Sequence, residues 1–120
     1  MTHVAVYGTL KRGESNHDRY LSHSEFTMEF TTLPKFTMRN AGFFPVLFCN
    51  GVHSIQVEIY RVSAPTLRSL DLLESVPFMY YRILSDNYWL YVGQPGYWNE
   101  NELPLVQPVN GVVSWTGKRT

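Results

Sequence analysis

The chain of 120 residues has a single cysteine, a formal net charge of zero and no cluster of lysine and arginine. A lone cysteine cannot form an internal disulfide, and Cys49 lies in an apolar stretch without metal-ligand spacing around it, so we expect a buried and inert thiol. None of the four histidines stands at a metal-ligand spacing from Cys, Asp or Glu, so a zinc site is not expected. Neutrality without a basic cluster argues against nucleic acid or an anionic membrane as the main partner.

Long hydrophobic runs are also absent. No apolar run reaches membrane-spanning length, and the N-terminus lacks the charged and apolar regions of a secretory signal. Internal repeats, linkers and low-complexity tracts do not occur either. With 44% hydrophobic and 15% aromatic residues, the chain is long enough for one core without disulfides or metals. We therefore expect residues 1–120 to form a single cytoplasmic domain.

The segment HVAVYGTLKRGESNH, from His3 to His17, is the most informative stretch of the chain. It reads as a buried strand that leads into a glycine-bearing loop and a helix start, which exposes backbone N–H groups that suit a carboxylate, a phosphate or an oxyanion. Gly8 and Gly13 have the spacing of a nucleotide phosphate-binding loop, but Glu14 occupies the place of its lysine. A small carboxylate or a carbonyl oxygen is the better candidate ligand.

The remaining pattern predicts an α+β domain with a curled or closed sheet. Alternating residues from Phe26 to Met38 predict two strands around a turn at Pro34. Asn50–Gly51 is the strongest hairpin signal, followed by a strand over residues 52–62. Residues 82–92 predict two further strands around an Asp-Asn turn.

The segment SAPTLRSLDLLES is the clearest helix, with Ser63 as its N-cap and leucines at helical spacing. Leu67, Leu70 and Leu73 define its apolar face, and Glu74 falls on that same face. A buried carboxylate has a raised pKa unless a cation compensates it, and can then serve as a general base or acid. The alternative is that Glu74 sits at a frayed helix end and turns into water. Spacing alone does not decide between them.

Several tyrosines could supply the apolar walls and hydroxyl donors of a small pocket, although each one alone is more simply explained as a core or rim aromatic. They are Tyr7, Tyr80, Tyr81, Tyr88 and Tyr91.

Taken together, five segments resemble the γ-glutamylcyclotransferase-like proteins in order and spacing. They are VYGTLKRGESNHDRYL, GFFPVL, VEIYRV, LDLLESVPFMYYR and WLYV, and they extend from His3 to about Val92. The runs K-R-G-x-x-N-H and E-S-x-P are closest to the γ-glutamylamine cyclotransferase branch. The chain departs from the family pattern at Val57, where glycine is usual, and at Phe44, where tyrosine is common. Nothing after Gly93 matches.

The resemblance implies a small mixed β-barrel with helices packed outside. It also implies an acyltransferase reaction in which the α-amine of a γ-glutamyl group attacks its own side-chain carbonyl, so that 5-oxoproline and a free amine are released. Glu74 would be the general acid and base, and no cofactor or metal would be needed because the task is mainly one of positioning. The expected partner is a small γ-glutamyl molecule, bound by a monomer. The implied substrate-binding residues are Tyr7, Gly8, Thr9, Leu10, Asn16, Tyr80 and Tyr91.

A binding module on the same fold is the alternative function. It would hold a small carboxylate or a peptide without turning it over.

Overall fold

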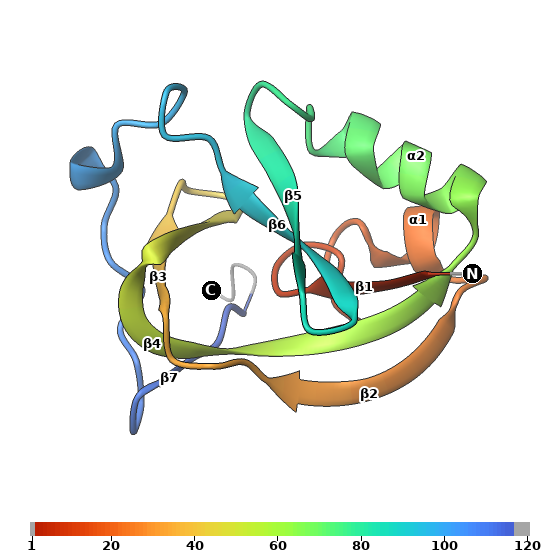
Figure 1. Ribbon diagram of the computed structural model, residues 1–120, viewed down its shortest axis with the longest axis horizontal. Coiled ribbons are helices and arrows are strands. Elements are labelled where there is room, and N and C mark those ends of the chain that lie inside the picture. The colour runs from red at the N-terminus through yellow and green to blue at the C-terminus, as the bar shows by residue number, and fades with distance from the viewer. Residues whose placement is uncertain (1, 117–120) are drawn as a thin grey trace.

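The computed structural model describes residues 2–116 and arranges them as one curled sheet with two short α-helices (Figure 1). No helix in these residues is long and apolar enough to cross a membrane. The elements, in chain order, are β1 (Thr2–Val6), α1 (His17–Leu21), β2 (Glu25–Thr31), β3 (Phe36–Asn40), β4 (Pro45–Val62), α2 (Ala64–Leu73), β5 (Tyr80–Ser85), β6 (Tyr88–Gly93), a 3-10 turn (Glu100–Glu102) and β7 (Val112–Val113).

The main sheet has the strand order β2-β4-β1-β6-β5, with β1 antiparallel to β4 and parallel to β6. The predicted α+β class is confirmed. The implied barrel does not close, because in the described residues the edge strands β2 and β5 pair with β4 and β6 and not with each other. Strand β4 instead runs across the molecule and curves upward at one end, where it pairs with β3 (Figure 1).

The predicted hairpin at Asn50–Gly51 is wrong, because both residues lie inside β4. Phe36 of β3 is opposite His53, whereas the next residue, Thr37, is opposite Phe48. The intervening residues of β4 therefore bulge out of the ladder, and the strand bends there without reversing.

The chain reverses earlier, in the loop 41–44, where the N–H of Ala41 donates to the carbonyl of Phe44 at 3.0 Å. This loop places Pro45 at the first position of β4, where a residue without an N–H donor is tolerated. Cys49 lies in the bulge and is exposed. The expectation of a buried thiol is therefore wrong, since the bulge lifts the side chain out of the alternation that an undisturbed strand would impose.

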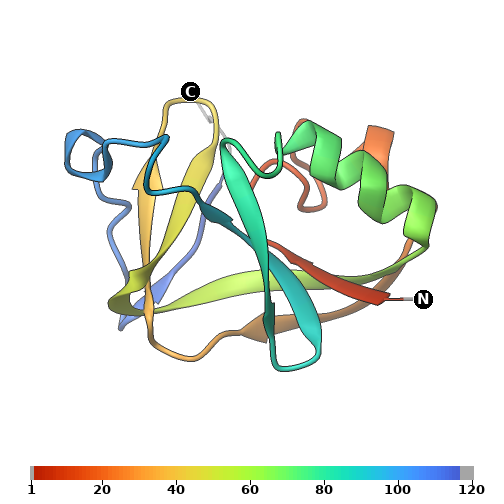
Figure 2. The same cartoon turned by 45° about the horizontal axis from the view of Figure 1, so that its top comes forward.

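Strand β1 contributes to two hydrophobic layers, because successive residues point to opposite faces of the sheet. Ala5, and Tyr7 directly after the strand, join the layer that includes Trp115, whereas Val4 and Val6 join the layer beneath the helices. Both helices lie on this second side of the sheet (Figure 2).

Helix α2 begins where the sequence predicts it. The Ser63 hydroxyl accepts a hydrogen bond from the N–H of Thr66 at 3.2 Å, which is the expected N-cap contact. Leu70 is fully buried and Leu67 packs against the same core, whereas Leu72 is exposed. The apolar face inferred from the leucine spacing is confirmed.

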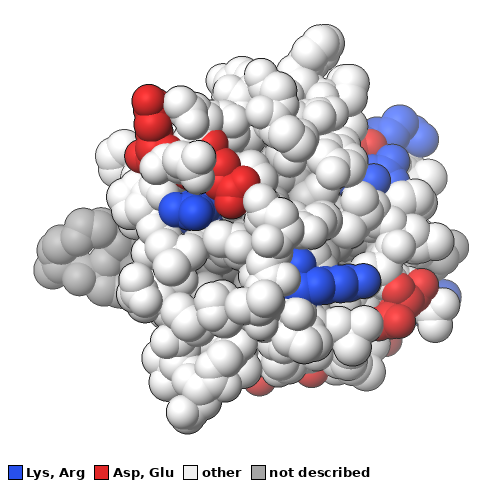
Figure 3. All heavy atoms as spheres, turned by 60° about the vertical axis from the view of Figure 1, so that its left-hand side comes forward, with Lys and Arg blue, Asp and Glu red and all other residues white. Residues whose placement is uncertain are grey.

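The chain after Gly93 wraps around the β3–β4 end of the molecule and returns as β7, which pairs in parallel with Ser54 and Ile55 of β4. On the face that Figure 3 turns toward the viewer, acidic and basic side chains form small separate groups on a mostly uncharged surface. One ion pair in this region joins Arg39 to Glu100 at 3.7 Å and ties the 3-10 turn to β3.

Candidate functional site

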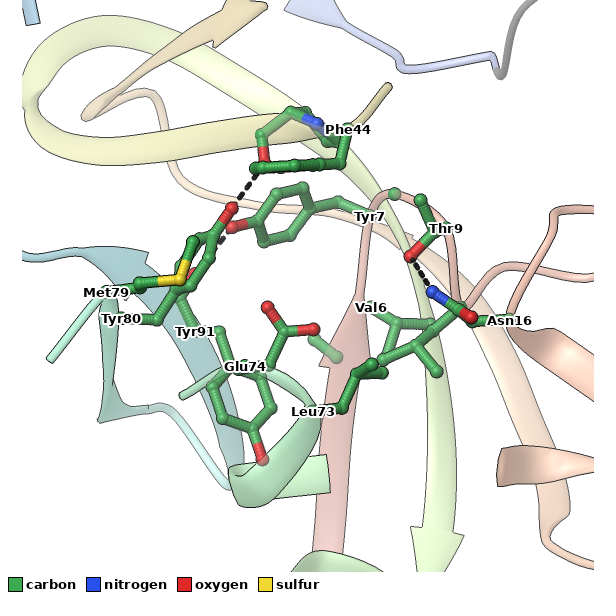
Figure 4. Close-up of a pocket in the computed structure, with 14 residues that line it drawn as sticks. Val6, Tyr7, Thr9, Asn16, Phe44, Leu73, Glu74, Met79, Tyr80 and Tyr91 are labelled. Carbon is green, nitrogen blue, oxygen red and sulfur yellow. Dashed lines mark hydrogen bonds between the residues drawn. The ribbon is translucent and has the colours of Figure 1, made fainter. Parts of the chain in front are cut away.

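A cavity of about 230 Å³ opens where the ends of β1 and α2 meet the starts of β4 and β5 (Figure 4). The structure brings all eight residues of the predicted site together around it. These residues are Tyr7, Gly8, Thr9, Leu10, Asn16, Glu74, Tyr80 and Tyr91.

Glu74 is the C-cap of α2, and the chain that follows it is firmly bonded to the helix. The N–H of Ser75 donates to the carbonyl of Leu72 at 3.2 Å, and the N–H of Val76 donates to that of Asp71 at 3.0 Å. With Ser75 at a φ of 52°, these two bonds form the Schellman motif of a well-ended helix. The helix end is therefore not frayed, and the carboxylate of Glu74 points into the cavity (Figure 4).

The Glu74 carboxylate is uncompensated. Among the described residues that line the cavity it is the only charged side chain, and none of them donates a hydrogen bond to it. Burial raises the pKa of Glu74 from 4.5 to about 7. A carboxyl group with that pKa can both accept and donate a proton near neutral pH.

A second carboxylate, one helical turn earlier, is in the opposite situation. Asp71 accepts hydrogen bonds from Nε and Nη2 of Arg82 at 2.7 and 3.1 Å, and from the hydroxyl of Tyr91 at 2.7 Å. The Arg82 guanidinium also lies 4.4 Å from the centre of the Trp89 ring. Because Arg82 is committed to Asp71, it does not pair with Glu74.

The tyrosines contribute rings to the cavity, and their hydroxyl groups donate elsewhere. Tyr7 donates to the backbone carbonyl of Tyr91 at 2.7 Å, and Tyr80 donates to that of Pro45 at 2.9 Å. The Tyr91 hydroxyl donates to Asp71. The prediction of hydroxyl donors is therefore wrong for these three residues, whose protons already bind protein acceptors.

In the loop after β1, two backbone carbonyl groups accept hydrogen bonds from N–H groups further along the same loop. The carbonyl of Gly8 accepts from the N–H of Lys11 at 3.1 Å, and that of Thr9 accepts from the N–H of Asn16 at 2.8 Å. In a trans peptide the C=O of one residue and the N–H of the next point in opposite directions. The N–H groups of Thr9 and Leu10 therefore point away from these bonds, and neither has a backbone acceptor among the described residues. Two adjacent N–H groups of this kind suit a carboxylate.

Six further residues line the cavity and were not predicted. Phe44 and Pro45 belong to the GFFPVL segment, so the signal was present but was not assigned to the site. The Pro45 ring packs closely on Gly8, where a Cβ atom would stand 2.7 Å from its Cδ and Cγ. Met79 follows the helix without a distinctive pattern of its own. The six residues are Ala5, Val6, Phe44, Pro45, Leu73 and Met79.

We expect the folded chain to lose stability as the pH rises from about 4.5 to about 8. The pKa of Glu74 is raised in the folded state, so the folded state holds this proton more tightly than the unfolded chain. The resulting stabilisation is present below the unfolded pKa and is lost as the pH rises through about 7, a change of about 3 kcal/mol.

Urea denaturation at the two pH values checks this expectation. The free energy of unfolding should fall by about 3 kcal/mol more for the wild type than for Glu74→Gln, which has no titrating group at this position. An equal fall in both proteins would show that the pKa of Glu74 is not raised.

The chain matches the family model described as gamma-glutamyl cyclotransferase, AIG2-like, over residues 4–109. It is 41% identical over 95 residues to a Vibrio cholerae protein whose name places it among the gamma-glutamylcyclotransferases. That match covers 76% of this chain and 81% of the Vibrio protein. It is also 40% identical over 90 residues to the gamma-glutamylaminecyclotransferase of Mus musculus. That match covers 68% of this chain and spans 60% of the mouse protein.

Solved structures show the same fold. The crystal structure of a mouse AIG2-like protein has a TM-score of 0.74 and 27% sequence identity, over 100% of this chain and 99% of that one. The allophanate hydrolase of Kluyveromyces lactis matches with a TM-score of 0.69 at 15% identity, over 88% of this chain and 19% of that one. At that identity the second match shows the fold alone.

Proposed function

The chain belongs to the gamma-glutamyl cyclotransferase, AIG2-like family, and on this premise we propose that it converts a γ-glutamylamine into 5-oxoproline and a free amine. The names of its relatives support an enzyme of this type. In the proposed reaction the α-amine of the γ-glutamyl group attacks its own Cδ carbonyl. A new N–Cδ bond closes the ring, and the bond from Cδ to the leaving nitrogen breaks.

The uncompensated carboxylate of Glu74 carries this proposal. The α-ammonium group must lose one proton before its nitrogen attacks and a second one as the lactam N–H forms, and the leaving nitrogen gains both protons as it departs as an ammonium ion. A carboxyl group with a pKa of about 7, facing the cavity, can accept the first proton and deliver it to the leaving nitrogen. No proton is consumed overall, and the intramolecular reaction requires no cofactor.

The loop after β1 supplies the second requirement, which is positioning. The N–H groups of Thr9 and Leu10 would bind the α-carboxylate and hold the flexible γ-glutamyl chain in a folded conformer with its amine near the carbonyl carbon. Asn16 donates to the Thr9 side chain at 2.9 Å and fixes the loop.

The uncompensated carboxylate also favours an enzyme over a binding module. A buried carboxylate without a partner lowers stability, and a protein that only binds a small carboxylate has no use for it.

Release of 5-oxoproline from a panel of γ-glutamyl compounds tests the proposal. The panel contains γ-glutamyl-ε-lysine, other γ-glutamylamines, γ-glutamyl amino acids and glutathione. We expect release from at least one γ-glutamylamine. No release from any compound, by protein with a cooperative unfolding transition, would contradict the enzymatic function and leave the cavity as a binding site.

A further inference from the structure

The cavity has two chemically different ends, and this difference bears on which amine the proposed reaction releases. Thr9 and Asn16 lie on one side of the Glu74 carboxylate, Met79 and Tyr80 lie on the other, and Phe44 lies above it (Figure 4). The polar side carries the N–H groups assigned to the α-carboxylate. The γ-carbonyl and the leaving nitrogen must lie near Glu74, so the rest of the leaving group extends toward Phe44 and Met79.

Trp98 contacts the residues of the apolar side and holds them in place. The indole N–H of Trp98 donates to the backbone carbonyl of Met79 at 2.9 Å. The Trp98 ring also meets Phe44 and Tyr80 edge-on, with centroid distances of 6.0 and 6.2 Å. A single residue from the segment after β6 therefore contacts three of the residues that line this side. The wall is preorganised by these contacts.

Some of the exposed apolar side chains are sequence neighbours of residues that line the cavity. Three of the large hydrophobic side chains that are exposed stand immediately before a residue that lines the cavity. They are Phe43, Leu72 and Phe78, with 85%, 81% and 74% of their surface exposed, and they precede Phe44, Leu73 and Met79.

We propose that Phe44, Met79 and the ring of Tyr80 form a leaving-group subsite, and that the preferred substrates are γ-glutamyl derivatives of uncharged hydrophobic amines. A leaving group with its own carboxylate would place that charge against an apolar wall, and Glu74, the one charged side chain among the described lining residues, is itself acidic. A hydrocarbon chain or an aromatic ring would instead lose water-exposed surface. This inference rests on the cyclotransferase function proposed above.

Two matched pairs of substrates isolate the charge. γ-Glutamyl-phenethylamide differs from γ-glutamyl-phenylalanine only by the carboxylate of the leaving group. γ-Glutamyl-n-pentylamide differs from γ-glutamyl-ε-lysine only by the amino and carboxylate groups at the far end. We expect kcat/KM for 5-oxoproline release to be at least about tenfold higher for the uncharged member of each pair.

Variants in the wall test which residues set this preference. Phe44→Ala removes a ring that lines the subsite, and Trp98→Phe removes the hydrogen bond to Met79 while it keeps an aromatic ring. The quantity compared is kcat/KM for γ-glutamyl-phenethylamide divided by kcat/KM for γ-glutamyl-methylamide. Both variants should lower this ratio, and Phe44→Ala should lower it by about tenfold. A purely structural defect would lower both values together and leave the ratio constant. Leu33→Ala, in an exposed turn away from the cavity, is the control.

The outcomes separate the two proposals. Equal or faster turnover of γ-glutamyl-phenylalanine and γ-glutamyl-ε-lysine would overturn the apolar subsite and leave the cyclotransferase function standing. A ratio that Phe44→Ala and Trp98→Phe do not change would also overturn the subsite. No release from any of the five compounds would remove the cyclotransferase function and the subsite together.

Discussion

Replacement of Glu74 by glutamine is expected to lower kcat/KM for 5-oxoproline release by about 10³-fold. Glutamine has nearly the same shape, so the cavity and the helix end should be preserved. It cannot accept the proton of the α-ammonium group or deliver a proton to the leaving nitrogen. The measurement is steady-state release of 5-oxoproline from the best γ-glutamyl compound, at a pH near the wild-type optimum.

The same variant should be at least as stable as the wild type at pH 8. Glutamine removes a charge that is buried without a partner, so the folded state no longer bears its desolvation penalty. Loss of activity together with unchanged or increased stability is a combination that misfolding cannot produce. Glu102→Gln, in the exposed 3-10 turn, is the matched control and should retain wild-type activity. Activity of Glu74→Gln within tenfold of the wild type would remove Glu74 from the mechanism.

Asp71 provides a second comparison, since it lies on the same helix end. Its carboxylate is bound by Arg82 and Tyr91, which keeps it away from proton transfer. The two acidic residues are three positions apart in the sequence, and composition does not distinguish them. Their difference arises from Arg82 of β5, which donates hydrogen bonds to the carboxylate of Asp71 and not to that of Glu74.

Local patterns predicted the parts of the site that depend on neighbours in the chain. The strand and loop from His3 to His17 form as expected, because a buried strand and a glycine turn are local signals. The apolar spacing of the leucines correctly placed Glu74 on the inner face of α2. Its position in the cavity also depends on the Schellman hydrogen bonds around Ser75. The sequence does not predict this motif, because serine occupies the position of positive φ at which glycine is usual.

Features that depend on distant segments were not predictable. The tyrosine hydroxyls bind acceptors 20 to 84 residues away along the chain, and no local pattern reveals such partners. The role of Trp98 is similar, because no motif is recognisable in its segment, although the family model extends to residue 109. Trp98 contacts Phe44 only through the fold. The bend at Gly51 was mistaken for a hairpin turn, since Asn-Gly favours both a tight turn and the close backbone approach that is found there.

Substitution of Gly51 by alanine is expected to destabilise the fold by about 3 kcal/mol or more. A Cβ atom at this position would stand 2.2 Å from the carbonyl oxygen of Phe36 and 2.2 Å from Oγ1 of Thr37. One of these neighbours belongs to the backbone of β3, which cannot rotate away as a flexible side chain could. The β3–β4 pairing would have to separate, and this would also displace Pro45, the first residue of β4, and Phe44, which precedes it. Urea denaturation at pH 7 measures the loss.

Gly96→Ala is the matched control, because a Cβ atom there meets nothing within 4 Å. This variant should change the free energy of unfolding by less than about 1 kcal/mol. The comparison also decides why Gly51 is glycine. Its φ is not positive, so glycine is not needed there for a left-handed backbone conformation, and only the close approach to β3 would make alanine costly. If Gly51→Ala proved as mild as Gly96→Ala, β3 and β4 would not be in close contact at this bend, and the sheet would need a different register there.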